Sequence, residues 1–397
     1  MRVLAITNLY PNPYQPHRAT FNRQQFAALA NEHQVRVIAP IAWTGEWSAR
    51  RRSKTPLLTE NRTRLCDGMV IHHPRYKFTP RMLRGWYGQF LVQSIRSCFN
   101  DAVREFQPDA VLGCWAYPDG WAAVQLAREA NLPVAIKVHG SDLLAIDDDS
   151  ARKNRTIEAL TSADAVIAVS QNLAARAIAM GADSVRVRVV YNGVDTSVFQ
   201  PGPVEQARQR LGLGLSEPLI LFVGNLLPVK GLDVLIDALA SLKNKGQRFE
   251  CAMVGEGSLR SELQNRINSA GLGERVKLIG SRPLEELPLW YQSSNLVVLP
   301  SRSEGVPNVL LEAAACGIRF VASRVGGIPE IAPADALVPP GDSAALAERI
   351  GAFLDSKDVP NIPAAFRAGS WRDSASALAS VLSDVVTAAN AQTTLAG

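Results

Sequence analysis

The chain has 397 residues, of which 47% are hydrophobic and 20% are charged. This is an ordinary globular composition, with enough apolar material for two domains of roughly 150–200 residues each. No apolar run reaches the ~18–20 residues of a membrane-spanning helix, and the N-terminal run Val3–Ile6 is too short for a signal peptide, so we expect a cytoplasmic protein. Five scattered cysteines without a C-x-x-C pair argue against disulfides and structural zinc.

The net charge of +5 conceals an asymmetry along the chain. Residues 1–110 hold 16 Lys and Arg against 7 Asp and Glu, a net of +9, whereas the remainder holds 26 against 30, a net of −4. The N-terminal quarter therefore predicts an acidic partner.

Short apolar runs alternate with helical patterns along the whole chain. The first half predicts strands at Val3–Ile6, Val35–Ala39, Met69–His72, Ala110–Gly113, Val134–Val138, Ala165–Val169 and Val187–Val190. The second half predicts strands at Leu219–Val223, Cys251–Val254, Val276–Ile279, Leu296–Leu299, Phe320–Ala322 and Ala336–Val338. Nearly continuous apolar strands separated by helices are typical of parallel sheets that are buried on both faces. We therefore predict an α/β protein with two Rossmann-like domains.

The proline- and glycine-rich segment 199–203 predicts a linker between these domains. We expect an N-terminal acceptor-side domain over residues 1–200 and a C-terminal donor-binding domain over residues 201–370. Residues 371–397 are expected to form a C-terminal helix and tail that packs back toward the N-terminal domain. Ligands of such sheets bind at the carboxyl ends of the strands, so the loops there should carry the chemistry.

The first predicted strand is followed by residues 8–13, Asn-Leu-Tyr-Pro-Asn-Pro, and not by G-x-G-x-x-G. This argues against an oxidoreductase that uses NAD or FAD. The sequence also lacks an H-x-x-x-H pair and Cys/His clusters, so we expect no metal.

Cations and aromatic residues are interspersed between residues 43 and 90. The set comprises Trp43, Trp47, Arg50, Arg51, Arg52, Lys54, Arg75, Lys77, Phe78, Arg81, Arg84, Trp86, Tyr87 and Phe90. Such a mixture fits an anionic membrane surface. It also fits an anionic lipid-diphosphate acceptor, or a solvated basic face whose aromatics lie in the core. Nucleic acid is not expected, because no recognisable binding motif accompanies the charge.

Two loops at predicted strand ends carry polar groups. His139, Gly140 and Asp142 follow one strand, where the glycine allows a close approach to a ligand. Segment 224–231 includes Lys230, which can meet the charge of a diphosphate. Taken alone, each of these loops could instead be a solvated turn.

The strongest pattern is residues 301–313, Ser-Arg-Ser-Glu-Gly-Val-Pro-Asn-Val-Leu-Leu-Glu-Ala. Pro307 suits the first turn of a helix, and Gly317 suits the position after its end. The backbone N–H groups from Gly305 to Asn308 then make a seat for a diphosphate. Glu304 and Glu312 would lie about 10–12 Å apart, which reaches both ends of a nucleotide-sugar and is too far for a glycoside hydrolase pair.

Together these loops resemble the retaining glycosyltransferases of glycosyltransferase family 4, which have the GT-B fold. The likeness lies in the Glu304–Glu312 segment, which is similar to the family's E-x7-E motif, and in the stretches 192–195, 230–231 and 325–330. It runs from Val3 to about Leu346. The resemblance implies a hexosyltransferase that moves a sugar from a nucleotide-diphosphate sugar to a glycan or lipid-linked acceptor. It implies retention, no cofactor and no essential metal. Together with the basic, aromatic segment 43–90, this places the expected cytoplasmic enzyme at the inner face of the plasma membrane.

The resemblance also implies residue roles. Glu304 would hold the donor hexose, Lys230 would neutralise the departing diphosphate, and His139 would lie beside the donor sugar. The other donor-binding residues it implies are Gly224, Asn225, Arg282, Gly305, Val306, Pro307, Asn308 and Glu312, with Glu312 on the ribose and Arg282 near the base. The acceptor-side candidates are Tyr10, Arg18, Thr20, Phe21 and Asp142.

Three positions depart from the family's pattern. Asn225 stands where an arginine is common, and the loop near residues 18–21 lacks the usual glycine. Arg319 stands where a proline is usual. Two other functions therefore stay open at this stage, namely a nucleotide-sugar epimerase on the same scaffold and a non-catalytic nucleotide-sugar-binding partner.

Overall fold

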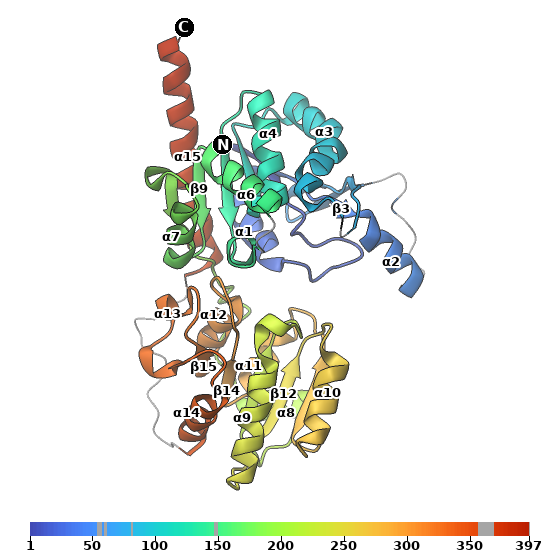
Figure 1. Ribbon diagram of the computed structural model, residues 1–397, viewed down its shortest axis with the longest axis vertical. Coiled ribbons are helices and arrows are strands. Elements are labelled where there is room, and N and C mark those ends of the chain that lie inside the picture. The colour runs from blue at the N-terminus through green and yellow to red at the C-terminus, as the bar shows by residue number, and fades with distance from the viewer. Residues whose placement is uncertain (54–57, 59–61, 81, 147–149, 356–368, 397) are drawn as a thin grey trace. The chain divides into compact units, whose positions relative to one another are not determined.

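The computed structural model describes residues 1–53, 58, 62–80, 82–146, 150–355 and 369–396. The chain divides into two compact units, which are described separately (Figure 1). The first comprises Met1–Asn192 together with the C-terminal segment from Trp371, and the second comprises Gly193–Ser370.

The first unit is built on an eight-stranded sheet. Its strands are β1 (Arg2–Ile6), β2 (Gln34–Ile38), β4 (Thr63–Cys66), β5 (Met69–His72), β7 (Ala110–Cys114), β8 (Val134–Val138), β9 (Ala165–Ala168) and β10 (Val187–Val189). They lie in the order β10-β9-β8-β7-β1-β2-β5-β4, with only β4 antiparallel to its neighbour. A separate two-stranded pair joins β3 (Ile41–Ala42) to β6 (Arg75–Tyr76).

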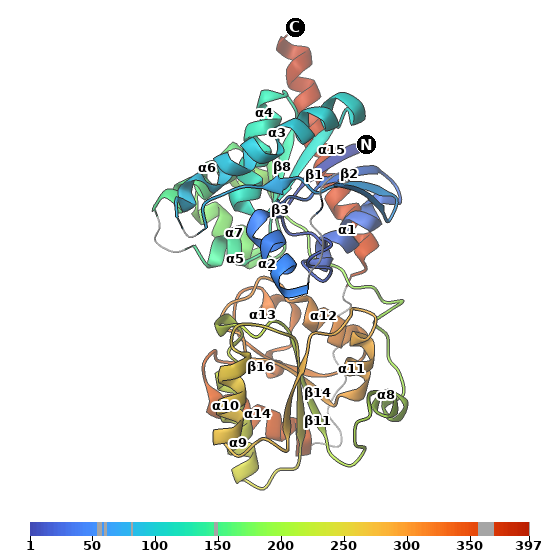
Figure 2. The same ribbon diagram turned by 90° about the vertical axis from the view of Figure 1, so that its right-hand side faces the viewer.

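Helices cover both faces of this sheet (Figure 2). They are α1 (Thr20–Ala30), α2 (Trp43–Ser53), α3 (Tyr87–Phe106), α4 (Trp121–Glu129), α5 (Ser141–Leu144), α6 (Ser150–Ser162), α7 (Gln171–Ala179) and α15 (Trp371–Ala396), with short turns η1 (Arg84–Trp86), η2 (Ala116–Gly120) and η3 (Ser184–Arg186). Leu4 and Ile6 pack in the core that contains α3 and α4, whereas Val3 and Ala5 pack in the core that contains α1 and α15. Successive residues of a strand point to opposite faces, so an all-apolar strand is what two covered faces require.

The second unit has a six-stranded, fully parallel sheet. Its strands are β11 (Leu219–Val223), β12 (Glu250–Val254), β13 (Val276–Gly280), β14 (Leu296–Leu299), β15 (Phe320–Ser323) and β16 (Leu337–Val338), in the order β13-β12-β11-β14-β15-β16. Its helices are α8 (Val204–Leu211), α9 (Leu232–Asn244), α10 (Arg260–Ser269), α11 (Leu287–Ser293), α12 (Asn308–Ala315), α13 (Ile328–Ile331) and α14 (Ser343–Asp355), with turns η4 (Pro228–Lys230) and η5 (Ala334–Ala336).

All thirteen predicted strands are present, and their ends differ from the predicted ends by at most one residue. The sequence did not predict β3, β4 and β6. The first and last of these have two residues each, and β4 is a largely exposed antiparallel edge strand. The predicted α/β class with parallel, doubly wound sheets is confirmed.

Both sheets reverse their strand order at one point. In the second unit β11 lies between β12 and β14, and in the first unit β1 lies between β2 and β7. At such a point, the connections that follow the two neighbouring strands, β11 and β14 or β1 and β7, run to opposite sides of the sheet. A crevice therefore opens between them, beyond the carboxyl ends of the strands. The loops after these four strands are therefore the places to look for a site.

Candidate active site

In the second unit, the loops after β11 and β14 bring Lys230 and Glu304 together. The Lys230 Nζ donates to Glu304 Oε1 at 2.6 Å, and the Ser301 hydroxyl donates to the same oxygen at 2.6 Å. Both side chains are largely shielded, with 20% of the lysine and 10% of the glutamate exposed. The predicted neighbours thus form one charged pair at the switch point.

The two loops are held against each other by backbone proximity and by an ion pair. Gly231 has a φ of +63°, and a Cβ placed on it would lie 2.1 Å from the Pro300 carbonyl oxygen. Arg302 donates to both carboxylate oxygens of Asp233, at 2.8 and 2.6 Å. Glycine is required at position 231 because any side chain would push the two loops apart.

A third loop, after β15, supports the backbone of Glu304. A Cβ on Gly326, whose φ is +54°, would lie 1.8 Å from the Glu304 carbonyl oxygen. The next residue, Gly327, donates its N–H to the Gly305 carbonyl at 2.8 Å. The glycine pair that follows β15 therefore fixes where the loop of Glu304 runs.

Helix α12 begins at Asn308, and Pro307 occupies the N-cap position. The proline thus lies one residue earlier than the first helical turn in which the sequence analysis placed it. Gly317 has a φ of +75° just beyond the helix, as its predicted position after the C-terminus requires. Gly305, Val306 and Pro307 are buried, so they can present only backbone to a ligand.

Glu312 lies in the second turn of α12. Its Oε2 accepts a hydrogen bond from the Tyr291 hydroxyl of α11 at 2.7 Å. Burial raises the pKa of Glu312 to about 7, and the tyrosine bond opposes part of that rise. This carboxylate therefore has different partners from Glu304 and titrates near neutral pH.

The remaining donor-side candidates flank this arrangement. Gly224 follows β11, and a Cβ on the neighbouring loop's Gly255 would lie 1.9 Å from the Gly224 carbonyl oxygen. Asn225 is exposed. Arg282, also exposed, follows β13 and lies 3.5 Å from Glu286. The unit thus gathers a cation, a helix N-terminus and two carboxylates, a set suited to a diphosphate and several hydroxyls.

In the first unit, His139 follows β8 at the start of a tight turn. The Asp142 carboxylate accepts from the backbone N–H groups of His139, Gly140 and Ala116, at 2.8 to 3.3 Å. Burial raises the pKa of Asp142, and these bonds oppose the rise. Asp142 is buried and holds this loop in place.

The His139 ring packs on Phe21, with centroids 5.0 Å apart. Burial and then the nearby charge of Lys137 hold the pKa of His139 well below its usual value, so the ring is neutral. Its Nε2 is buried and has no hydrogen-bond partner among the described residues. An unsatisfied buried nitrogen of this kind is suited to a ligand hydroxyl.

The other acceptor-side candidates differ in position. Thr20 begins α1 beside Phe21. Arg18 lines a cavity beyond β1. Tyr10 instead stacks on Phe26 in the core, with 2% of its surface exposed, and burial raises its pKa above the usual range. The structure therefore separates Tyr10 from the residues that line the cavity.

Sequence reasoning missed Asn8, Asp119, Lys137 and Tyr291. Asp119 comes just after β7, so the rule that was applied to the other strand ends would have found it. Lys137 lies inside an apolar strand, and Tyr291 gives no signal until its partner Glu312 is known.

Among the described residues, no group of three or more His, Cys, Asp or Glu side chains could hold a metal ion. The helices in that part of the chain include none that is both long and apolar enough to cross a membrane.

Two family models match this chain. The model of glycosyl transferases group 1 covers residues 203–367, and that of glycosyltransferase family 4 covers residues 19–198. The D-inositol 3-phosphate glycosyltransferase 1 of Catenulispora acidiphila is 32% identical over 336 residues, which is 78% of each chain. TuaC of Bacillus subtilis, named for teichuronic acid biosynthesis, is 29% identical over 88% of each chain.

Solved structures share the fold. Sucrose-phosphate synthase from Thermosynechococcus elongatus superposes with a TM-score of 0.75 at 21% identity, covering all of both chains. HepE of Anabaena, solved with UDP-glucose, superposes with a TM-score of 0.69 at 20% identity, covering 99% of each chain.

Proposed function

The chain belongs to the group 1 glycosyltransferases of glycosyltransferase family 4, and from that membership we propose that it moves a hexose-type sugar, with retention, from a nucleotide-diphosphate donor to a glycan or lipid-linked acceptor. The observation that carries the proposal is the Lys230–Glu304 pair beside the N-terminus of α12. We assign the donor to the unit that holds this pair and the acceptor to the unit that holds His139.

The residues supply the electrostatics of the reaction without a metal. As the bond between sugar and diphosphate breaks, negative charge develops on the leaving group. Lys230 and the backbone N–H groups at the start of α12 stabilise that charge, because they are fixed before the reaction and partly shielded from water. Glu304 accepts from hydroxyls of the hexose, and Glu312 accepts from those of the ribose. These contacts give no support to the two alternative functions, a nucleotide-sugar epimerase and a non-catalytic nucleotide-sugar-binding partner.

The comparisons suggest where to look for the substrates. HepE was solved with UDP-glucose, so a UDP-linked hexose is the first donor to test. TuaC is named for teichuronic acid biosynthesis, which supports a role in surface polysaccharide or glycolipid assembly.

The test is thermal stabilisation of the full chain by UDP, GDP and ADP, each with excess EDTA. A nucleotide at ~100 times its dissociation constant stabilises the folded state by about 2.7 kcal/mol. We expect one nucleotide to stabilise the protein in EDTA, and Lys230→Ala to abolish the effect. Hydrolysis or transfer of the matching nucleotide-sugar, with the anomer of the product read by NMR, tests retention. No stabilisation of well-folded protein by any of the three would refute the donor site.

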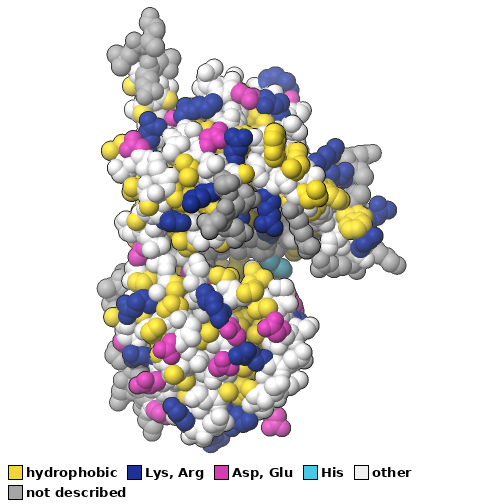
Figure 3. Space-filling model, in the orientation of Figure 1, with side chains coloured by type: hydrophobic (Ala, Val, Ile, Leu, Met, Phe, Trp, Pro, Cys, Tyr) yellow, Lys and Arg dark blue, Asp and Glu magenta, His cyan; other side chains and the backbone are white. Residues whose placement is uncertain are grey.

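We also propose that the basic, aromatic surface of the first unit attaches the protein to the inner face of the plasma membrane. Its exposed apolar side chains are Trp43, Trp47, Met82, Leu83 and Trp86, between 37% and 67% exposed. Around α2, hydrophobic side chains lie among Lys and Arg on the visible face (Figure 3). Indole rings next to arginines suit the headgroup region of an anionic bilayer. Lys54, Arg81 and the side chain of Arg52, which the sequence analysis included, lie outside the described residues.

The membrane proposal predicts co-sedimentation with anionic liposomes at low salt and much less with neutral ones. The double variant Trp47→Ser, Trp86→Ser should lose most of this binding. Leu215→Ser, at a position in the second unit that is 64% exposed, should keep it. Equal pelleting with neutral liposomes, or no loss in the double variant, would contradict the proposal.

A further inference from the structure

Two adjoining cavities lie in the first unit, beyond the carboxyl ends of its strands. One encloses about 340 Å³ and the other about 460 Å³. Phe78, Tyr87 and Pro118 line both, so the two cavities adjoin; we refer to the pair as the hollow and to each cavity as one of its lobes. Together they are within the size range of ligand sites in proteins.

The hollow lies at the switch point of the sheet, where the loops after β1 and β7 meet. Asp119 is fully buried there and accepts from the backbone N–H and the side-chain amide of Asn8, both at 2.9 Å. The two oxygens of Asn8 in turn accept from Arg18, whose Nε and Nη2 lie 2.9 Å from its carbonyl and side-chain oxygens. A buried carboxylate thus fixes Asn8, and Asn8 fixes the guanidinium on the wall of the hollow.

The charge of Arg18 is not neutralised by direct contact. Its Nη1 lies 3.3 Å from the Gln15 side-chain oxygen, so the guanidinium donates to uncharged oxygens. Arg18 forms no ion pair within the described residues. Burial lowers its pKa, and the nearby charge of Asp119, with which it has no direct contact, opposes that shift. A positioned, partly buried arginine with remaining N–H donors favours an anion that it can bind through two hydrogen bonds.

Aromatic rings make up much of the remaining wall. Phe78 lies between Tyr76 and Tyr87, with centroids 4.8 and 5.0 Å away. Trp115 and Tyr117 line the second lobe. Rings that present a flat apolar face beside a polar tip suit a ring with apolar faces and polar edges, such as a sugar or polyol.

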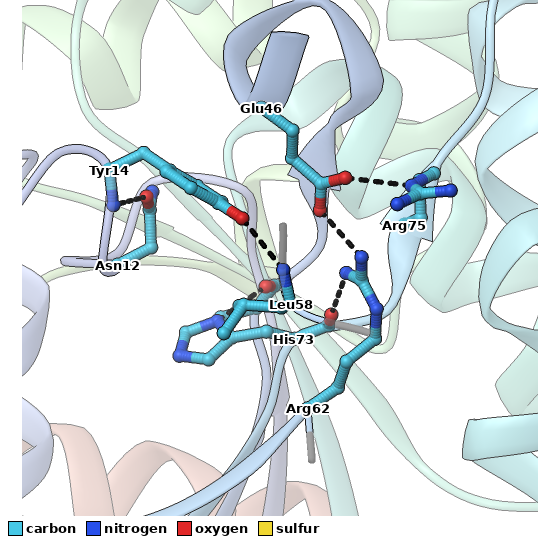
Figure 4. Close-up of polar contacts among 8 residues, drawn as sticks. Asn12, Tyr14, Glu46, Leu58, Arg62, His73 and Arg75 are labelled. Carbon is cyan, nitrogen blue, oxygen red and sulfur yellow. Dashed lines mark hydrogen bonds and ion pairs between the residues drawn. The ribbon is translucent and has the colours of Figure 1, made fainter. Parts of the chain in front are cut away.

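Helix α2 forms part of the wall of the hollow. It is anchored by the buried carboxylate of Glu46, whose contacts are drawn in Figure 4. Glu46 is 1% exposed and pairs with Arg62 at 2.8 Å and with Arg75 at 2.7 Å. Thr44 and Gly45, which directly precede Glu46, line the first lobe. The wall formed by α2 is therefore built into the unit.

We propose that this hollow binds the acceptor, and that the acceptor combines a sugar or polyol ring with an anionic group, phosphate or carboxylate, held by Arg18. Asn8 and Asp119 act as positioning residues for the guanidinium. The inference rests on the proposed transferase function and narrows it from any glycan or lipid-linked acceptor to an anionic one.

The test is calorimetric titration of the full chain with glucose, glucuronate and glucose 6-phosphate, in the presence of saturating UDP. The variants are Arg18→Gln and Arg18→Lys. The control is Arg23→Gln, because Arg23 lies on the same stretch of chain, pairs with Asp67 at 2.7 Å and does not line the hollow. Vesicles of phosphatidylcholine with and without phosphatidic acid test whether the anion belongs to a lipid.

We expect the two anionic sugars to bind better than glucose. A preference for the vesicles with phosphatidic acid counts toward Arg18 only where it persists in the double variant Trp47→Ser, Trp86→Ser. Arg18→Gln should remove this preference with a loss of about 10-fold or more, the scale of a charge-assisted hydrogen bond. Arg18→Lys should keep part of it, and Arg23→Gln should keep all of it. The inference fails if UDP binds but neutral and anionic ligands bind alike, or if Arg18→Gln behaves as the control does. Failure of UDP to bind would instead overturn the proposed function.

Discussion

Lys230 occupies the position where the donor's diphosphate is proposed to bind, but in this structure its ammonium is already paired with Glu304 at 2.6 Å. Replacing Lys230 and replacing Glu304 should therefore have opposite effects on nucleotide binding. Lys230→Met removes the cation, while Glu304 keeps its hydrogen bond from the Ser301 hydroxyl. Glu304→Gln removes the anion and leaves the lysine available to the phosphates.

The magnitude follows from the contacts. A charge-assisted hydrogen bond contributes about 1.5–3 kcal/mol, so its loss weakens binding by roughly 10- to 150-fold. Lys230→Met should weaken UDP by at least this factor, because an uncompensated carboxylate also remains beside the phosphates. Glu304→Gln should bind UDP as tightly as the wild type or more tightly, and should lose turnover because its contact with the hexose is lost.

Calorimetric titration with UDP in excess EDTA measures both effects. Lys243→Ala is the matched control, since Lys243 is a partly exposed lysine near the end of α9 that donates to the Gly271 carbonyl. The double variant Lys230→Met, Glu304→Gln should recover part of the lost affinity, because the unpaired carboxylate is gone. If Lys230→Met binds UDP as the wild type does, or if Glu304→Gln weakens UDP as strongly as Lys230→Met, the assignment of the phosphate site is wrong.

Three further perturbations test the reasoning. Gly326→Ala would place a Cβ 1.8 Å from the Glu304 carbonyl oxygen, so it should lower both Tm and UDP affinity, while Gly212→Ala, with a similar φ of +66° and open space, should lower Tm modestly and spare UDP binding. Burial raises the pKa of Glu312 to about 7, so UDP affinity should fall as pH drops from 8 to 6, and Glu312→Gln should bind weakly without this dependence, as titrations at each pH will show. Burial likewise raises the pKa of Asp119 from 3.8 to about 7. Between pH 4 and 7 the unfolded chain has released this proton while the folded chain still holds it, so the stability of the wild type should fall as pH rises. Urea denaturation should show this fall relative to Asp119→Asn, by roughly 4 kcal/mol at most.

The sequence predicts the strands well because most of them are buried on both faces. A run such as Leu219–Val223 is unbroken by polar residues, and a short apolar run of this kind is typical of a buried strand. The strand β4 escapes prediction for the converse reason. It is an exposed edge, so its residues do not have to alternate or to be apolar.

The candidate site is predictable as a set of loops but not as a set of contacts. The position of Lys230 after β11 and of Glu304 after β14 can be inferred from the strand pattern. Their pairing depends on β11 and β14 being neighbours in the sheet, which is a matter of strand order and not of sequence spacing. The glycine at 326 is conspicuous in the sequence, but that it makes room for the Glu304 backbone is visible only in the structure.

Lys137 shows what a pattern of apolar residues conceals. It lies in β8, is fully buried, and donates to Gln25 at 2.6 Å and to Asn192 at 3.3 Å. Burial lowers its pKa to about 8, so it remains largely protonated at neutral pH with uncharged partners. Such a charge is costly to bury, and an apolar residue would serve the core better.

The positions of Gln25 and Asn192, the partners of Lys137, give a structural reason for burying this charge. Asn192 is the last residue of the first unit before the chain leaves it. Gln25 also donates to the Ser374 hydroxyl at 2.8 Å, and Ser374, just after the chain returns, donates to the Tyr191 carbonyl at 2.6 Å. One buried lysine thus ties together α1, β8 and both segments by which the chain leaves and re-enters the unit. Because these residues are brought together from four distant parts of the sequence, neither their spacing nor their composition could have predicted the network.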